Sequence, residues 1–346
     1  MSLAGLRPER CVITGASGFI GSHLCERLQG RQPMVAMLRS AAAVQDWRSR
    51  GREVVQADLL DPQRLKEALR GCDAVVHLAQ GDRAEQATRH LVEASVAAGV
   101  RRFVHISTMS VHGPVPGPEA ASEDTAVIGR YGHDYSDSKA EQEACVQAAH
   151  DRGDLPVVIL RPTVVYGLGG HFERQVIDQA RQGRVTVFDE GQGVCNAVFV
   201  EDVCDAIDAA LVRPEALGQA MFINGDEALT WGQFIHTFAE MVQPPPRFER
   251  LDSAAAQAYW AAHPPLQAGG LTDRVWRKLK RLTGWQPPVA PWPPQGRIWR
   301  ETFPIQFRND KAKRLLGWRP QVDFAQGAAR SEDWLRAQGL LGKVAA

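Results

Sequence analysis

The chain has 346 residues, with 40 Lys and Arg against 40 Asp and Glu, so its formal net charge at pH 7 is zero. This length allows one large domain or two, and hydrophobic and charged shares of 44% and 23% are those of a globular protein. Because no excess of positive charge would attract polyanions, the composition argues against nucleic acid or an anionic membrane as partner and favours a small molecule.

The cysteines and apolar runs predict where the chain resides. The six cysteines are scattered, with no close pair typical of a zinc site or a disulfide framework, so we interpret them as reduced core thiols and expect no metal. The first residues lack the charged-then-apolar layout of a signal peptide, and no apolar run reaches the roughly 18 residues of a membrane span. We therefore expect a cytoplasmic protein.

The first half of the sequence alternates short β-branched apolar runs with segments of helical period. The predicted strands cover residues 10–14, 33–38, 53–56, 74–78, 103–107 and 157–160. The predicted helices cover residues 19–28, 62–69, 86–98 and 136–149. Strict alternation implies right-handed crossovers and a parallel sheet covered on both faces, which is the doubly wound α/β architecture.

The pattern changes after about residue 161. Glycines interrupt it at 167–170, residues 243–303 are rich in Pro and Trp, and every tryptophan except Trp47 lies from Trp231 onward. We predict a nucleotide-binding domain over 1–165, to which a segment of about 194–212 returns, and a smaller, mostly helical substrate-binding part over 166–346.

A glycine-rich loop, Thr14-Gly15-Ala16-Ser17-Gly18-Phe19-Ile20-Gly21, follows the first predicted strand and opens the first predicted helix. In a dinucleotide-binding Rossmann unit, Gly15 would make the tight turn, Gly18 would let the backbone approach a pyrophosphate, and Gly21 would let the helix pack closely on the sheet. The spacing is G-x-x-G-x-x-G, and an ordinary strand-to-helix turn is the alternative. The position favours nucleotide binding.

The ends of the next strands offer further contacts to a dinucleotide. Arg39 follows the second strand, about 20 residues beyond the loop, where an arginine suits the 2′-phosphate of NADP and an acid would suit NAD. A solvated surface arginine is the alternative. Asp58 follows the third strand and could accept from the adenine amino group or cap the helix that begins near Pro62. The small Ala79, after the fourth strand, would let the chain pass close to the cofactor.

Tyr135 and Lys139 are four residues apart on a predicted helix, so their side chains share one face. Half-ionising a tyrosine at pH 7 requires lowering its pKa by about three units, or roughly 4 kcal/mol. An ammonium about 4 Å away supplies ~1 kcal/mol in water and ~4 kcal/mol at an effective dielectric near 20. The pair can therefore move a proton only in a partly desolvated site, and otherwise marks a solvated helix face.

Ser107 ends the fifth predicted strand and Thr108 follows it, and one of their hydroxyls is expected to orient a substrate oxygen beside Tyr135. With these motifs together, the chain resembles the extended short-chain dehydrogenase/reductase family, of the epimerase/dehydratase-like type. The resemblance covers most of the chain and includes the segments Arg161–Gly167, Phe199–Val203 and Leu316–Pro320.

The resemblance implies a site. Tyr135 would be the acid/base, Lys139 would lower the tyrosine pKa and hold the cofactor ribose, and Thr108 would be the catalytic hydroxyl. His112 replaces the family's usual tyrosine, which leaves open whether it is a spacer or touches the substrate. The remaining cofactor contacts that the resemblance implies are Gly15, Ser17, Gly18, Phe19, Ile20, Gly21, Arg39, Asp58, Leu59, Leu78, Ala79, Ser107, Arg161, Thr163 and Val164.

Two reactions fit the resemblance. We expect net hydride transfer between NADP(H), or NAD(H), and a secondary alcohol or ketone, as in the hydroxysteroid-dehydrogenase-like and dihydroflavonol-reductase-like branches. The alternative is a nucleotide-sugar epimerase or dehydratase with tightly held NAD. Val164 and Cys195 stand where such members carry residues that grip the diphosphate, so Arg174 or Arg184 would have to serve it. A nucleotide-sensing module is a third possibility, but it would not need the proton donor Tyr135.

The C-terminal half suggests the kind of substrate. Trp260, Trp276, Trp285, Trp292 and Trp299 suit a bulky, weakly charged molecule, or else a core of large side chains. The basic run 275–285 could form an amphipathic helix on a membrane, although a solvated helix face is the commoner reading and we do not expect membrane contact. The resemblance also implies a homodimer that pairs through the helix bearing Tyr135.

Overall fold

The structure is a computed structural model, and it describes residues 7–113, 116–263, 290–302 and 304–341. A seven-stranded parallel sheet has the order β11-β6-β5-β4-β1-β2-β3. In chain order, the strands and α-helices up to β6 are β1 (Cys11–Thr14), α1 (Phe19–Leu28), β2 (Met34–Leu38), α2 (Ala41–Ser49), β3 (Val54–Gln56), α3 (Pro62–Ala68), β4 (Ala74–His77), α4 (Ala84–Ala98), β5 (Arg102–Ile106), α5 (Asp134–Asp151) and β6 (Val157–Pro162). The predicted doubly wound Rossmann architecture is confirmed.

Helices cover both faces of this sheet because its strands are apolar on both sides. Along β1, Ile13 packs into the cluster that includes residues of α1 and α7 (Val200–Val212), while Val12 packs into the cluster under α3, α4 and α5. The sheet order reverses between β1 and β4, so the carboxyl ends of these two strands flank the point where such sheets bind ligands.

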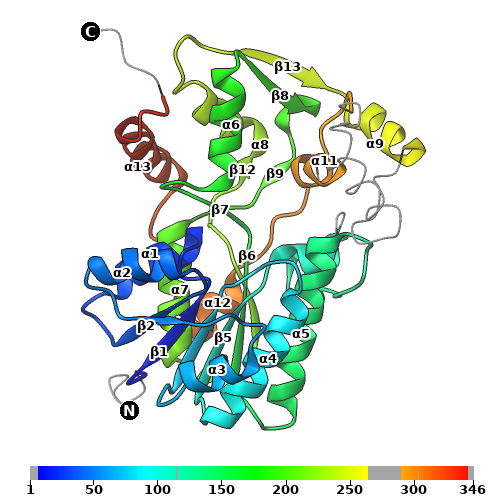
Figure 1. Ribbon diagram of the computed structural model, residues 1–346. Helices are drawn as coiled ribbons and strands as arrows, with labels where there is room; N and C mark the ends of the chain where they lie inside the picture. The colour runs from blue at the N-terminus through cyan, green and yellow to red at the C-terminus, as the bar shows by residue number, and fades with distance from the viewer. Residues whose placement is uncertain (1–6, 114–115, 264–289, 303, 342–346) are drawn as a thin grey trace, which may run out of the picture.

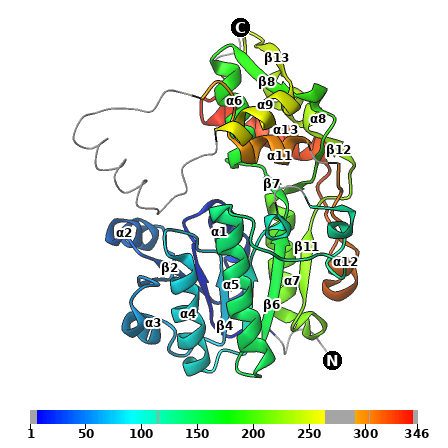
Figure 2. The ribbon, with the colours of Figure 1, turned by 90° about the vertical axis from the view of Figure 1, so that its right-hand side faces the viewer.

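The remaining elements stand beyond the carboxyl ends of the strands (Figures 1 and 2). They are β7 (Val164–Tyr166), α6 (His171–Arg181), β8 (Arg184–Phe188), β9 (Val194–Cys195), β10 (Ala197–Phe199), β12 (Leu229–Thr230), α8 (Trp231–Ala239), β13 (Arg247–Leu251), α9 (Ser253–Ala262), α11 (Gln295–Thr302) and α13 (Phe324–Ala337). An aromatic core holds this part together, with Tyr166, Phe199, Phe234 and Phe238 in edge-to-face or tilted contact. It is mostly helical, as predicted.

More of the chain returns to the sheet than the sequence indicated. Besides α7, the strand β11 (Ala220–Ile223) extends the sheet beside β6, and α12 (Asp310–Leu316) buries Ala312 and Leu316 in the same core cluster. The helix α2 was also not predicted, because Val44 is its only buried residue and no apolar stripe marks it.

None of the helices in the described ranges is both long and apolar enough to cross a membrane. The basic run 275–285 lies outside those ranges. All six cysteines are free, and Cys145 is the one that is partly exposed.

Candidate active site

The glycine-rich loop is closed by contacts that exclude side chains. Gly15 has φ +68°, and its carbonyl accepts a 2.9 Å hydrogen bond from Gly18 N. A Cβ on Gly15 would lie 2.7 Å from the nitrogen of Ala79, at the end of β4, and a Cβ on Gly21 would collide with the Gly15 carbonyl. The loop therefore leaves its backbone and the amino end of α1 free to approach an anionic ligand.

A cavity of about 640 Å³ opens beside this loop. Its floor is formed by the loop and the ends of β4, β5 and β6, and its walls by the start of α5 and by residues of α6 and α11. The predicted site residues that line it are Gly15, Gly18, Phe19, Ile20, Gly21, Leu78, Ser107, Thr108, Tyr135, Lys139 and Thr163. The structure thus brings the predicted cofactor loop and the predicted acid/base residues to one cavity.

Tyr135 and Lys139 project from the first two turns of α5. The Lys139 ammonium is buried and donates a 2.8 Å hydrogen bond to the Ile106 carbonyl. Burial lowers the pKa of Lys139 to about 8, although the negative charge of Glu143 acts to raise it. Tyr135 is 43% exposed where it faces the cavity. The protein packed around its hydroxyl raises its pKa, and a hydrogen bond with Thr108 acts to lower it. The tyrosine is therefore protonated in the cofactor-free protein at neutral pH.

The hydroxyls at the end of β5 lie at the same cavity. The Thr108 hydroxyl accepts a 3.2 Å hydrogen bond from Ser110 N and donates to the Ser110 hydroxyl. The Ser107 hydroxyl is buried and has no hydrogen-bond partner among the described residues. An unpaired buried hydroxyl beside an open cavity fits a site that a bound molecule completes. With the glycine loop, these residues fit a nicotinamide dinucleotide.

Two residues predicted to contact the cofactor, Arg161 and Val164, do not line the cavity. The Arg161 guanidinium is buried and forms an ion pair with Glu143 of α5 at 2.7 Å. It also donates to His112 Nε2 at 3.3 Å, while His112 Nδ1 donates to the Val127 carbonyl at 2.9 Å. His112 is buried outside the cavity lining, so it supports Arg161 and does not reach a ligand there. Val164 is buried in β7.

The residues predicted at the adenosine end lie outside the cavity lining. Asp58 accepts from Leu60 N at 2.9 Å, whereas the residue that caps α3 is Asp61, which accepts from Gln63 N and Arg64 N. Ser17 and Arg39 are exposed, and Leu59 and Ala79 are partly buried. Arg39 directly precedes Ser40, the residue that caps α2, and its side chain has no hydrogen bond or ion pair within the described ranges.

Two arginines of α11, Arg297 and Arg300, line the cavity and were not predicted. Arg174 and Arg184, proposed from sequence as phosphate-binding residues, are exposed outside the lining, and Arg184 pairs with Glu249 at 3.0 Å. The R-x-x-R-E spacing could have indicated two arginines sharing one acid on a helix, but no sequence signal placed that helix at the cavity.

The tryptophans that the sequence offered either as substrate contacts or as core residues fall into both groups. Trp299 lines the cavity. Trp260 and Trp292 pack against the small cluster of Phe188, Ala256 and Ile298. Trp276 and Trp285 lie outside the described residues.

Known proteins resemble the chain over nearly its whole length. It is 28% identical to the 2-alkyl-3-oxoalkanoate reductase of Stenotrophomonas maltophilia, over 93% of this chain and 98% of that protein. It is 26% identical to the ceramide reductase of Caulobacter vibrioides, over 96% of each. Among solved structures, the epimerase Mth375 of Methanothermobacter thermautotrophicus matches with a TM-score of 0.73 at 20% identity, over 97% of this chain and 94% of that chain, which shows a shared fold.

A family model points the same way. The model of the NAD dependent epimerase/dehydratase family matches residues 11–224, which include the glycine loop, Tyr135 and Lys139. The chain therefore belongs to the NAD-dependent epimerase/dehydratase family and is an NAD-dependent enzyme of the extended short-chain dehydrogenase/reductase type.

Proposed function

We propose that the protein catalyses net hydride transfer between a nicotinamide dinucleotide and a ketone or secondary alcohol of a bulky, largely apolar small molecule. The observation that carries this proposal is that Thr108, Tyr135 and Lys139 line the same cavity as the glycine loop, while much of the rest of its wall is apolar. Met109, Phe172, Trp299 and Phe307 are among those apolar residues. The reductases that align with more than nine-tenths of the chain support it.

The side chains divide the proton chemistry among them. Thr108 holds the substrate oxygen beside Tyr135, whose hydroxyl donates a proton to that oxygen in reduction and recovers it in oxidation. The Lys139 ammonium stabilises the phenolate that this transfer leaves, and it does so strongly because the site is partly desolvated. When a nicotinamide is bound, it supplies the hydride in reduction and accepts it in oxidation.

Changing Tyr135 to Phe tests this assignment. We expect turnover of an aliphatic β-oxo ester with NADPH to fall by about 10²- to 10⁴-fold, because the general acid is lost while the ring still fills its place. Cofactor affinity, measured by nucleotide fluorescence, should be unchanged. Tyr131→Phe is the matched control, since Tyr131 is also half-exposed but does not line the cavity. Undiminished turnover in Tyr135→Phe would remove the tyrosine from the mechanism.

The same assay separates net reduction from an epimerase or dehydratase cycle. A reductase consumes NADPH in step with the alcohol formed, whereas an epimerase or dehydratase returns its cofactor unchanged. Neither Arg174 nor Arg184 lines the cavity, so neither is placed to hold the diphosphate of a nucleotide sugar. Product formed without matching NADPH consumption would contradict the proposal.

We further propose a preference for NADP over NAD, carried by Arg39. Its exposed guanidinium follows β2 and has no partner within the described ranges, so it is free to bind a 2′-phosphate. Arg39→Asp should raise the KM for NADPH about 10- to 100-fold and change the KM for NADH little, because a hydrogen bond to a charged group is worth about 1.5–3 kcal/mol. Arg48→Asp, an exposed change in α2, is the control. Equal effects on both cofactors would remove Arg39 from this role.

A further inference from the structure

The cavity wall carries positive charge that no acid in the lining balances. Among the described residues that line it, Lys139, Arg297 and Arg300 are cationic, and none is Asp or Glu. Glu301 lies behind the wall and is shared, with Oε1 2.7 Å from Arg297 Nε and 3.2 Å from Arg300 Nη2. One carboxylate thus faces two guanidinium groups.

The two arginines differ in how fully their donors are used. Arg297 donates to Glu301 and also to the side chain and carbonyl oxygens of Thr186, at 2.8 and 2.7 Å. Arg300 donates within the described ranges to Glu301 alone, and its Nε is buried without a partner. Its guanidinium carbon lies 4.9 Å from the ring centre of Phe172 and 5.2 Å from that of Trp231. Arg300 is therefore held in place by aromatic rings with donors to spare.

This location concentrates polar atoms that lack partners. Of nine buried side-chain polar atoms without a hydrogen bond in the described ranges, three lie here: Arg300 Nε, Glu301 Oε2 and Trp231 Nε1. Buried polar groups in folded proteins are normally paired, so this cluster, which lies partly behind the wall and includes the cavity-lining Arg300, points to a site that a ligand completes. The Arg300 side chain is 23% exposed, whereas that of Glu301 is 4% exposed, so the arginine is the one a ligand can reach.

We propose that Arg300 binds a carboxylate of the substrate, which makes the substrate an apolar oxo or hydroxy acid. This inference rests on the proposed function, which it narrows to one substrate class. A planar guanidinium suits a carboxylate because two parallel N–H groups can meet its two oxygens. Phe172 and Trp299, which line the cavity with Arg300, suit the alkyl portion of such an acid better than a sugar.

A nucleotide diphosphate is the competing anion, and the arrangement favours it less. It carries more charge than one lightly engaged arginine can match, since each of the three nitrogens of Arg297 already donates a hydrogen bond. The relative that aligns with 93% of the chain is named for reduction of a 2-alkyl-3-oxoalkanoate, a compound with a carboxylate and alkyl chains.

The test compares a 2-alkyl-3-hydroxyalkanoate with its methyl ester, by calorimetric titration of the protein saturated with NADP⁺. Wild-type protein should bind the acid at least about tenfold more tightly than the ester, the effect of one charge-assisted hydrogen-bonded pair. Arg300→Gln should abolish that preference and leave affinity for the ester within about twofold. Arg300→Lys should restore part of it, and Arg184→Gln, which removes an exposed arginine outside the cavity, should leave it intact.

The wild-type ratio of acid to ester affinity is itself a readout, so the test does not depend on the folding of any variant. Equal affinity for acid and ester would overturn the proposal, as would a preference that survives Arg300→Gln. Tight binding of UDP-glucose that is lost in Arg300→Gln would instead assign Arg300 to a diphosphate. Because titration measures binding, failure of the carboxylate subsite appears here, whereas failure of the proposed reaction appears in the Tyr135→Phe assay.

Discussion

In the proposed mechanism, proton transfer at Tyr135 depends on Lys139, so the groups around its ammonium matter. Behind it lie two buried imidazoles, His77 and His105, whose pKa values burial lowers far below 6.5, so both are neutral at pH 7. The His77 ring is fixed by Thr14 at 2.8 Å and Thr88 at 2.9 Å. Because these two neighbours carry no charge, they would not weaken the proposed action of the ammonium on the phenolate.

The pKa of Lys139, about 8, predicts a pH limit for catalysis. Below it the ammonium is charged and stabilises the phenolate formed in reduction, whereas above it this stabilisation is lost. The kcat/KM for ketone reduction should be flat below about pH 7 and fall above about pH 8, by up to tenfold per pH unit. A pH profile of the wild type measures this. Lys139→Arg, which stays charged, should be slower and lack that fall. An identical fall in kcat/KM in Lys139→Arg would show that a group other than Lys139 causes it.

At the scale of elements, residues four apart on α5 connect the cavity with the sheet. Tyr135 faces the cavity, Lys139 donates to the carboxyl end of β5, and Glu143 pairs with Arg161 of β6. Since residues at this spacing lie on one side of a helix, a single face of α5 carries the proposed acid/base pair and the two contacts that fix the position of the helix. Arg161, which the family resemblance assigns to the cofactor, in this structure positions that helix.

This helix and the glycine loop could be predicted because their signals are local. The loop's glycines and the spacing of Tyr135 and Lys139 lie within eight residues in each case, next to predicted strands and helices. Arg300 could not be predicted in the same way. Its role depends on Phe172 and Trp231, which are more than sixty residues away in the chain and meet it only through the tertiary fold. The helix α2 was missed for a different reason, since it buries too little to show a periodic pattern.

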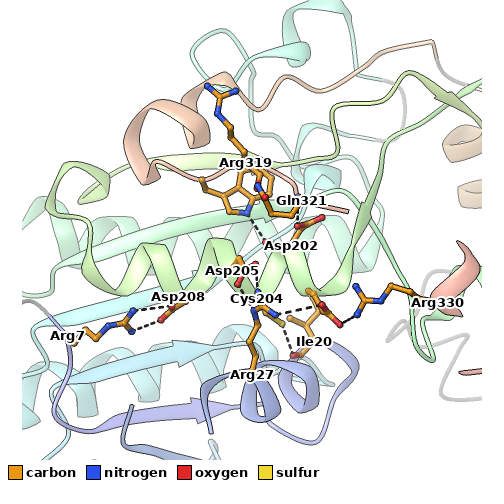
Figure 3. Close-up of polar contacts among 12 residues, drawn as sticks. Arg7, Ile20, Arg27, Asp202, Cys204, Asp205, Asp208, Arg319, Gln321 and Arg330 are labelled. Atoms are coloured by element: carbon orange, nitrogen blue, oxygen red, sulfur yellow. Dashed lines mark hydrogen bonds and ion pairs between the residues drawn. The ribbon is translucent and has the colours of Figure 1, made fainter. Parts of the chain in front are cut away.

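At the scale of the whole molecule, α7 is the junction between the sheet and the part above it (Figure 3). Arg27 of α1 forms an ion pair with Asp205 of α7, and Arg330 of α13 forms one with Glu201 of α7. Two turns of one helix thus connect the cofactor-loop helix with the C-terminal helix. The junction bears on the cavity because Tyr135 and Arg300, which both line it, belong to the two parts that α7 joins.

Asp202 is the buried residue of this junction: its carboxylate accepts from Gln321 N at 2.7 Å and Val322 N at 3.2 Å. Asp202→Asn should lower the free energy of unfolding by about 1–3 kcal/mol, because an amide has one acceptor oxygen, which leaves one of the two backbone N–H groups facing an amide NH2 without a partner. Asp208→Asn on the same helix, which breaks a partly exposed pair with Arg7, should cost under about 1 kcal/mol. Urea denaturation of both variants measures the difference. Equal losses would show that the Asp202 contacts do not hold the two parts together.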